Sequence, residues 1–189
     1  MFDMYLKQVV NGEHLSSEEA YCAANMLLHE DISEIKAAAF LTALRTRREN
    51  ENELLGFIQA LKEQSIKMEC DRELMDTCGT GGDGHRTFNI STATAIVLAA
   101  CGVSVAKHGN RGASGPVGSS DVLEALGVRV ELTPDEAQRL LDRTGFTFLF
   151  APHYHPVLRK MLAVRKGLGI PTLFNFLGPL LNPYQLTYQ

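Results

Sequence analysis

Residues 76–91 read Asp-Thr-Cys-Gly-Thr-Gly-Gly-Asp-Gly-His-Arg-Thr-Phe-Asn-Ile-Ser, and a largely apolar run at 93–101 follows. The glycines at 79, 81, 82 and 84 are crowded into one short segment. Glycine lets the backbone take positive φ and bring its N–H groups close to a ligand. The N-terminus of a following helix adds a partial positive charge at the same place. The stretch therefore predicts an anion-binding loop that leads into a helix.

Two other phosphate-binding motifs fit this stretch less well. The glycines satisfy G-x-G-x-x-G, but a dinucleotide fold needs an acidic residue about 20 positions further on, at the end of the next strand. The next predicted strand ends in Lys107 and His108, and this positive end suits a second phosphate better than a ribose diol. The P-loop pattern fails because His85 and Arg86 stand where it requires Lys and Ser or Thr.

The overall composition limits the class of protein. The chain has 189 residues, enough for one α/β domain or two small ones, and its hydrophobic content of 45% supports a core. A net charge of −4 argues against a nucleic-acid binder. No apolar run approaches the roughly 18 residues of a membrane span, and the N-terminus lacks a signal-peptide pattern. We therefore predict a cytoplasmic protein that binds neither nucleic acid nor membrane.

The four cysteines are widely spaced and form no C-x-x-C pair, which argues against a metal or redox motif. Cys22 and Cys101 lie in alanine-rich apolar stretches, which predicts buried free thiols. Cys78 adjoins the glycine loop, but a nucleophile needs a general base beside it, and the sequence places none near. A structural thiol is therefore the favoured interpretation of Cys78.

Residues 1–70 predict a small helical domain. The segment Ser16-Ser-Glu-Glu19 is a capping box before apolar residues at helical spacing. Asp31 or Ser33 can cap a second helix, and a third begins near Asn50. Amphipathic helices of this kind must bury their apolar stripes, either against one another or against another chain.

From residue 71 onward, short apolar runs alternate with capped helices, which predicts an α/β domain over residues 71–189 with a parallel sheet. The predicted strands lie at 74–78, 103–107, 128–131 and 147–151, and the predicted helices at 91–101, at 119–126, from 133 and from Pro156. Ligands bind at the carboxyl ends of such strands, so the segments at Gly79 and His108 are expected at one edge of the sheet. Residues 156–183 have the option of packing back on the helical domain.

Several blocks, in order along nearly the whole chain, resemble the anthranilate phosphoribosyltransferase family. They are the glycine loop, Asn89-Ile-Ser-Thr, Lys107-His-Gly-Asn-Arg111, Phe150-Ala-Pro-His-Tyr-His-Pro156, Val164-Arg165 and Phe174-Asn-Phe-Leu-Gly-Pro-Leu-Leu-Asn-Pro183. The resemblance implies the nucleoside phosphorylase/phosphoribosyltransferase type of fold and transfer of the phosphoribosyl group from phosphoribosyl pyrophosphate to anthranilate in tryptophan biosynthesis. It also implies Mg²⁺ as cofactor and a homodimer formed through the helical domain.

The resemblance also implies a set of substrate-binding residues in or beside these blocks: Gly79, Gly82, Asp83, Thr87, Asn89, Thr92, Lys107, His108, Asn110, Ser119, Tyr154, His155 and Arg165. Within the set, the loop residues would hold the diphosphate and ribose, Lys107 would face the phosphates, and Arg165 would pair with the anthranilate carboxylate. Ser91 would be a Mg²⁺ ligand. No residue is identified as a general base.

Some of these residues have plain structural explanations as well. Asn89 and Ser91 suit a helix cap, which does not exclude a ligand. His155 can simply precede a helix, and Arg165 can be an exposed cation at a helix end.

The chain departs from the family in two respects. Pro116 and Val117 stand where the family has a basic residue and a serine. Family members are also much longer, and their paired acidic Mg²⁺ ligands have no counterpart here. We therefore expect an N-terminal portion or a shortened member. A pyrimidine nucleoside phosphorylase-like enzyme and a non-catalytic module that keeps the dimer surface remain as alternatives.

Overall fold

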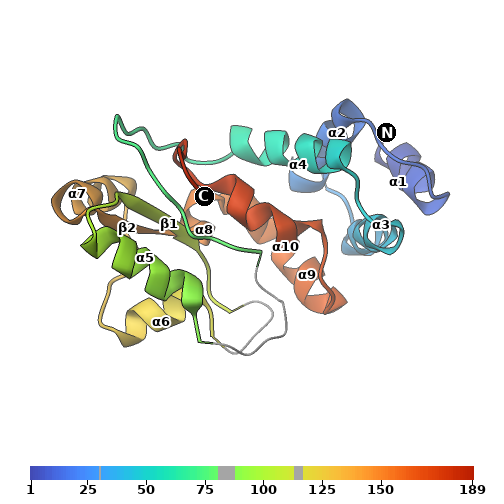
Figure 1. Cartoon of the computed structure of the whole chain (residues 1–189). Coiled ribbons are helices and arrows are strands. Elements are labelled where there is room, and N and C mark those ends of the chain that lie inside the picture. The colour runs from blue at the N-terminus through green and yellow to red at the C-terminus, as the bar shows by residue number, and fades with distance from the viewer. Residues whose placement is uncertain (30, 81–87, 113–116) are drawn as a thin grey trace. The chain divides into compact units, whose positions relative to one another are not determined.

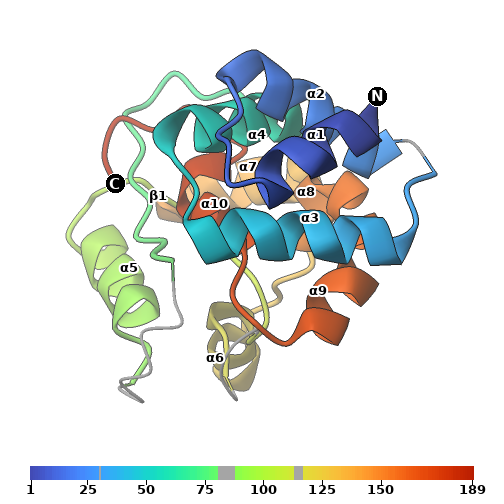
Figure 2. The same ribbon diagram turned by 90° about the vertical axis from the view of Figure 1, so that its right-hand side faces the viewer.

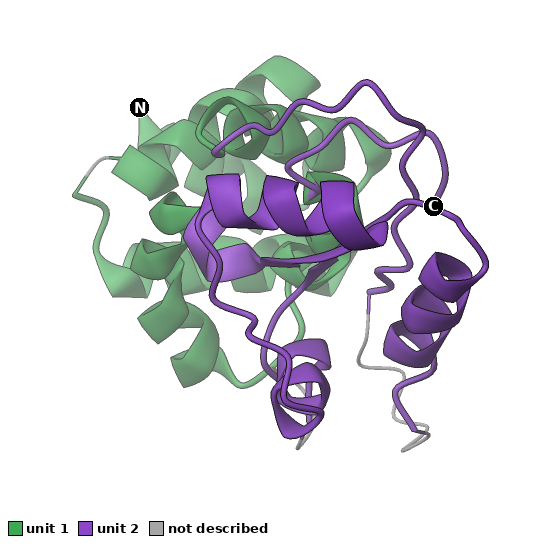
Figure 3. Cartoon of the chain, turned by 90° about the vertical axis from the view of Figure 1, so that its left-hand side faces the viewer, with its two compact units in different colours: residues 1–65, 155–181 green, residues 66–154, 182–189 purple. Residues whose placement is uncertain are grey.

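The computed structural model describes residues 1–29, 31–80, 88–112 and 117–189. They form two compact units (Figure 3). The helical unit contains Met1–Ser65 and His155–Leu181, and the sheet unit contains Ile66–Tyr154 and Asn182–Gln189. The predicted combination of a helical N-terminal part with a parallel-strand α/β part is confirmed. Within the described ranges, no helix has both the length and the apolar character needed to cross a membrane.

The helical unit contains helices and short 3-10 turns (Figure 1). They are α1 (Phe2–Val10), α2 (Ser17–His29), α3 (Glu34–Arg47), α4 (Glu51–Glu63), η1 (Pro156–Met161), α9 (Leu162–Leu168), α10 (Leu173–Leu177) and η2 (Gly178–Leu181). α2 packs along α4, and α1 lies against α3 (Figure 2). Their apolar stripes meet in one core, where Phe40 and Phe57 are almost fully buried. Packing within the unit thus buries most of the apolar helix stripes that the sequence predicts.

The predicted helix starts of this unit are confirmed. The Glu19 N–H donates to Ser16 Oγ at 3.2 Å, and the Ser16 N–H donates to Glu19 Oε2 at 2.9 Å. Ser33, rather than Asp31, caps α3 by accepting a backbone N–H. Asn50 caps α4 in a second capping box. Each cap satisfies donors that the first helical turn leaves unpaired, which is why short local motifs set these boundaries.

A buried carboxylate, Glu53, joins three segments of the helical unit. It is 1% exposed and accepts the backbone N–H groups of Leu15 at 2.9 Å and Asn50 at 3.0 Å. Arg47 at the end of α3 donates to both of its carboxylate oxygens. Burial acts to raise the pKa of Glu53, but the hydrogen bonds from Arg47 and the two backbone groups outweigh it and lower the pKa.

Glu53→Gln is expected to lower the free energy of unfolding of the helical unit by about 2 kcal/mol at pH 7, because a charge-assisted network loses its anion. Since the folded pKa lies below the ordinary value of 4.5, the wild-type advantage is present above about pH 5 and is lost as the pH falls through the folded pKa. Urea unfolding at pH 7 and pH 3 measures this, with the exposed Glu34→Gln as control. An equal difference at both pH values would contradict the prediction.

Among its described residues, the sheet unit is built on two parallel strands, β1 (Val105–Gly109) and β2 (Phe146–Phe150), with Val105 opposite Phe146 and Gly109 opposite Phe150. Its helices are α5 (Ile90–Ala100), α6 (Ser119–Ala125), α7 (Pro134–Thr144) and α8 (Ala151–Tyr154). Alternate residues of β2 face opposite sides. Phe148 packs with Leu123 of α6, whereas Leu149 packs with Leu141 of α7. This pairing places the carboxyl ends of both strands at one edge.

Two predicted strands of this unit are wrong. Residues 74–78 form only isolated bridges, from Met75 to Val105 and to Tyr188. The Asp76 side chain accepts the backbone N–H groups of Cys78 at 2.9 Å and of His108 at 3.2 Å, which a strand ladder would otherwise use. The described residues 128–131 contain no strand either, although Val130 is buried.

Two further predictions are corrected at other places in the chain. The helix predicted from Pro156 begins as the 3-10 turn η1, and its α-helical part starts only at Leu162. The thiol of Cys101, predicted to be buried, is exposed because it lies at the C-terminal end of α5.

Candidate functional site

A buried lysine lies near the carboxyl end of β1. Lys107 is 1% exposed, and its Nζ donates to Thr77 Oγ1 at 3.2 Å and to Ser91 Oγ at 3.5 Å. None of the ion pairs among the described residues involves Lys107. Burial lowers its pKa, and the negative charge of Asp76 opposes that shift. The ammonium group is thus held among hydroxyl groups, with capacity left for an anion.

The N-terminus of α5 forms the second part of the site. Asn89 caps this helix, because its Oδ1 accepts the Thr92 N–H and the Ser91 hydroxyl, both at 3.1 Å. The Thr77 hydroxyl donates to the Ser91 carbonyl at 2.8 Å and so ties the segment before the glycine loop to the first turn. Thr92 is buried, and its Oγ1 has no partner among the described residues. The positive end of a helix and the Lys107 ammonium therefore meet at Ser91.

The other predicted residues of the sheet unit differ in their surroundings. Gly79 and Asn110 are exposed, whereas His108 is buried. Ser119 opens α6, and its Oγ lies 2.7 Å from where a Cβ on Gly109 would stand, so only glycine leaves room for it. The predicted loop residues Gly82, Asp83 and Thr87 lie outside the described residues. Pro116 also lies outside them, whereas Val117 is exposed.

The remaining predicted residues, Tyr154, His155 and Arg165, lie at or beyond the boundary between the units. Tyr154 packs in the core of the sheet unit, and burial raises its pKa to about 12. His155 belongs to the helical unit, where its Nε2 lies 2.8 Å from the carbonyl oxygen of Leu181. Both side chains are buried, so a role beside an acceptor stays a prediction for them.

Arg165 on α9 has a guanidinium that forms no ion pair with another described residue. The group lies over the ring of Phe174 at 5.5 Å, and burial lowers its pKa. The stacking orients a planar cation that can bind a carboxylate with two hydrogen bonds. This arrangement differs from the freely exposed helix-end cation that the sequence also allowed.

Sequence reasoning missed three residues that build this site. Asp76 is 1% exposed and accepts hydrogen bonds from the backbone of Cys78 and His108 and from the side-chain amide of Asn182. Thr77 bridges Lys107 and α5. The position of Asp76 and Thr77 directly before the glycines could have drawn attention to them. Asn182 is 106 positions from Asp76, and no local pattern connects the two.

The donor set around Ser91 meets only part of what Mg²⁺ requires. Among the described residues, no group of three His, Cys, Asp or Glu side chains could hold a metal ion. The Ser91 hydroxyl is a single neutral oxygen at a helix start. Mg²⁺ keeps several waters and accepts one or two protein oxygens when phosphates supply the others. The described residues therefore fit a Mg²⁺ ion that arrives with a phosphate ligand rather than one held by the protein alone.

Cys78 is expected to react slowly with thiol reagents. Burial, together with the charge of Asp76, raises its pKa to about 11, so only about one thiol in a thousand is ionised at pH 8. Maleimide labelling of the native chain should modify the exposed Cys101 first and Cys78 much more slowly. Cys101→Ser, as the control, should remove the fast phase. Rapid modification of Cys78 in that variant would contradict the prediction and reopen a nucleophilic role.

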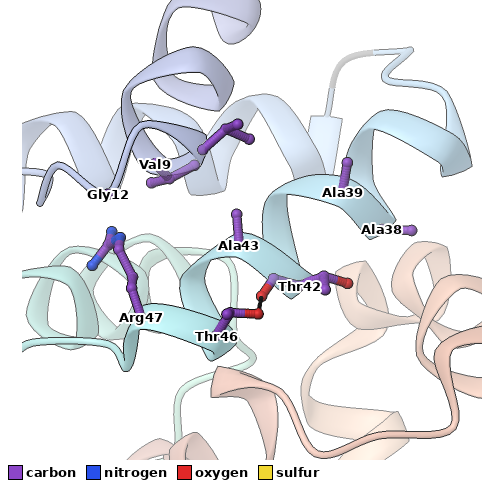
Figure 4. A pocket seen from close by; sticks show the side chains of 9 residues that line it. Val9, Gly12, Ala38, Ala39, Thr42, Ala43, Thr46 and Arg47 are labelled. Carbon is purple, nitrogen blue, oxygen red and sulfur yellow. Dashed lines mark hydrogen bonds between the residues drawn. The ribbon is translucent and has the colours of Figure 1, made fainter.

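A groove with a volume of about 590 Å³ opens on the helical unit, and none of the residues that line it belongs to the predicted site set (Figure 4). It is lined by residues of α1 and the turn after it and by residues of α3: Val9, Val10, Gly12, Ala38, Ala39, Thr42, Ala43, Thr46 and Arg47. The lining is mostly apolar and made of small side chains. Its lining contains no cationic side chain except Arg47, which Glu53 already engages.

Family models match both parts of the chain. A model described as "Glycosyl transferase family, helical bundle domain" matches residues 4–65, and one described as "Glycosyl transferase family, a/b domain" matches residues 71–189. Anthranilate phosphoribosyltransferase from Syntrophomonas wolfei is 67% identical over 189 residues, which cover 100% of this chain and 56% of that protein. The enzyme of the same name from Bacillus cereus is 50% identical over 98% of this chain and 54% of its own length. The chain thus spans about half the length of the curated relatives it matches.

Solved structures give the same result. A crystal structure of anthranilate phosphoribosyltransferase from Thermus thermophilus matches with a TM-score of 0.87 at 43% identity, over 97% of this chain and 58% of that one. The Saccharomyces cerevisiae enzyme, in complex with phosphoribosyl pyrophosphate and Mg, matches with a TM-score of 0.87 at 31% identity, over 97% and 55%. These relatives favour the transferase over the nucleoside phosphorylase alternative. The chain belongs to the glycosyl transferase family, and the resemblance to anthranilate phosphoribosyltransferases that its motifs indicate is confirmed along its length.

Proposed function

We propose that the protein transfers the phosphoribosyl group from phosphoribosyl pyrophosphate to anthranilate and releases pyrophosphate. The observation that carries the proposal is the Lys107 ammonium, buried among Thr77, Ser91 and the N-terminus of α5. A buried cation is costly unless an anion or several hydrogen bonds compensate for it. The yeast relative with phosphoribosyl pyrophosphate and Mg bound supports a diphosphate as that anion.

Each part of this arrangement has a separate task in the proposal. Lys107 and the α5 N-terminus attract the departing pyrophosphate and stabilise the negative charge that develops on it. The Asn89 cap, which accepts the Thr92 N–H, keeps the first turn of α5 in place, and the Thr92 hydroxyl, which has no partner among the described residues, binds a phosphate oxygen. Mg²⁺, held by Ser91 and phosphate oxygens, would neutralise part of the pyrophosphate charge. The protein contributes mainly orientation and electrostatics, and no described side chain needs to act as a general base.

The acceptor end of the proposal rests on Arg165. Its guanidinium, stacked on Phe174 and without an ion-pair partner among the residues described, suits the planar carboxylate of anthranilate. A yeast relative was solved in complex with 4-fluoroanthranilate, which supports an aromatic acid as the second substrate. Asn110 and His108, at the end of β1, remain proposed contacts to the sugar and the acceptor.

Calorimetric titration with phosphoribosyl pyrophosphate, with and without Mg²⁺, tests the proposal on this chain. We expect saturable binding that Mg²⁺ strengthens. Ser91→Ala should remove most of the Mg²⁺ effect, whereas Ser104→Ala, which deletes a hydroxyl before the other end of β1, should keep it. Turnover is then assayed with anthranilate and, for the phosphorylase alternative, with phosphate and a pyrimidine nucleoside. A folded chain that does not bind the diphosphate would overturn the proposal.

We also propose that the face formed by α1 and α3 is a homodimer contact. The groove in Figure 4 and the exposed apolar side chains Met4, Val10 and Ile35, the last 82% exposed, support this face. Ala43→Glu, which adds a charge to the groove, should yield a monomer in sedimentation experiments, while Ala100→Glu on α5 should not change the assembly. A wild-type chain that is monomeric at every concentration would contradict the contact.

The proposed function also includes a cytoplasmic location, and the four free cysteines are compatible with a reducing compartment.

A further inference from the structure

The Asp76 carboxylate joins the two segments of the sheet unit that face the proposed anion site. Its Oδ1 accepts the Cys78 N–H at 2.9 Å and the His108 N–H at 3.2 Å. Cys78 leads into the glycine loop, and His108 directly follows Lys107 on β1. One buried oxygen atom thus sets the separation between the start of the loop and the end of the strand.

Asn182 holds this carboxylate from the opposite side. Its Nδ2 donates to Asp76 Oδ2 and to the Ala106 carbonyl oxygen, both at 2.8 Å. Its Oδ1 accepts the Tyr184 N–H at 3.0 Å, so both ends of the amide are engaged and its orientation is fixed. The backbone of the same C-terminal segment adds a further bond, because the Asp76 N–H donates to the Tyr188 carbonyl oxygen at 3.1 Å.

The pattern of partners requires an acceptor on both oxygens of residue 76. Every described group that hydrogen-bonds to the carboxylate is an N–H donor. An asparagine at this position would turn an NH₂ group toward either the Asn182 amide or the two backbone N–H groups, so that donors would face each other in a buried place. Burial raises the pKa of Asp76, and the bond from Asn182 and the charge of Lys107 oppose that shift. The hydrogen-bond geometry therefore requires a carboxylate at residue 76, whereas a simple cap needs only one acceptor oxygen.

We propose that Asp76, held by Asn182, is a positioning residue that sets the register between Cys78, which leads into the glycine loop, and the Lys107 end of β1. Residues 182–189 thereby belong to the pyrophosphate-binding apparatus, although they supply no ligand to it. This inference rests on the proposed function. Neither residue needs to touch the substrate, because each acts through the backbone of Cys78 and His108.

Titration of the 189-residue chain with inorganic pyrophosphate tests the inference. Asn182→Ala keeps the Asp76 carboxylate and its hydrogen bonds to the Cys78 and His108 N–H groups but removes the amide that holds the carboxylate. This variant should bind pyrophosphate about tenfold more weakly. Asp76→Asn should weaken it at least as much. The double variant should be no worse than Asp76→Asn alone, because both changes remove one shared interaction. Asp142→Asn, which breaks an exposed 3.0 Å ion pair with Arg72 in the same unit, should stay within about twofold of wild type.

Hydrogen exchange separates positioning from general loss of structure. In Asn182→Ala, the amides of Cys78 and His108 should exchange faster, while amides in the middle of α7 keep their wild-type protection. Far-UV circular dichroism confirms that each variant is folded, and Asn182→Ala is decisive if Asp76→Asn does not fold. Binding that is unchanged in a folded Asn182→Ala overturns this inference alone, as does weaker binding with unchanged exchange at both amides. Failure of the folded wild-type chain to bind pyrophosphate overturns the proposed function and the inference with it.

Discussion

Gly56→Ala is expected to destabilise the helical unit by roughly 3 kcal/mol. A Cβ at this position in α4 would lie 2.3 Å from the Ser17 carbonyl oxygen, 2.7 Å from the Tyr21 nitrogen and 2.8 Å from the Ala20 Cβ. Two of these atoms belong to the backbone of α2, so no rotamer change can relieve the overlap. The two helices would have to move apart and loosen the core around Phe57. Urea unfolding followed by circular dichroism measures the loss.

Gly167→Ala is the matched control for this prediction. Gly167 also lies within a helix of the same unit, α9, and a Cβ there would meet nothing within 4 Å among the described residues. Alanine has the higher helix propensity, so this change should be neutral or stabilising by up to about 1 kcal/mol. If both substitutions had the same small effect, close packing of α2 on α4 would not explain why Gly56 is required.

Lys107→Met is expected to weaken binding of phosphoribosyl pyrophosphate by about a hundredfold, equivalent to about 2.7 kcal/mol. The substitution keeps the length of the side chain and its apolar stem but removes the buried cation of the proposed phosphate site. The free energy of unfolding should stay the same or rise by up to about 2 kcal/mol, because a desolvated charge is replaced by an apolar group. Titration calorimetry and urea unfolding of the same preparations measure the two effects.

Lys107→Met should therefore lose affinity for phosphoribosyl pyrophosphate without losing stability. A variant that loses binding because it is misfolded would lose stability as well. Lys67→Met, a substitution at an exposed lysine of the same unit, should change neither quantity by more than a small amount. Wild-type affinity in a folded Lys107→Met variant would show that the buried ammonium does not face the diphosphate.

Local chemistry explains which features could be predicted from the sequence. The caps at Ser16, Ser33 and Asn50 act over three or four residues, and each was found at its expected place. The sequence also predicted that the segment at Gly79 and the end of the strand at Lys107 share one edge of the sheet, and Thr77, two residues before Gly79, accepts a hydrogen bond from Lys107 at 3.2 Å.

The failures occurred where partners come from distant parts of the chain. Residues 74–78 have the composition of a strand, but the Asp76 side chain takes over backbone donors that a ladder would use. Asn182 reaches this aspartate across 106 positions. Cys101 has apolar neighbours in sequence yet is exposed, because burial of a helix depends on what covers each of its faces.

Sequence alone determined the family, the order of helical and sheet parts, and the residue types that we propose meet a diphosphate, because motifs, caps and periodicity express interactions between near neighbours. Tertiary structure alone decided that Gly56 cannot be alanine even though helix propensity favours alanine, and that Asp76, Thr77 and Asn182 belong to the site. Both decisions depend on which atoms from distant segments come within a few ångströms of each other. The packing of the folded chain sets these distances, and no local pattern encodes them.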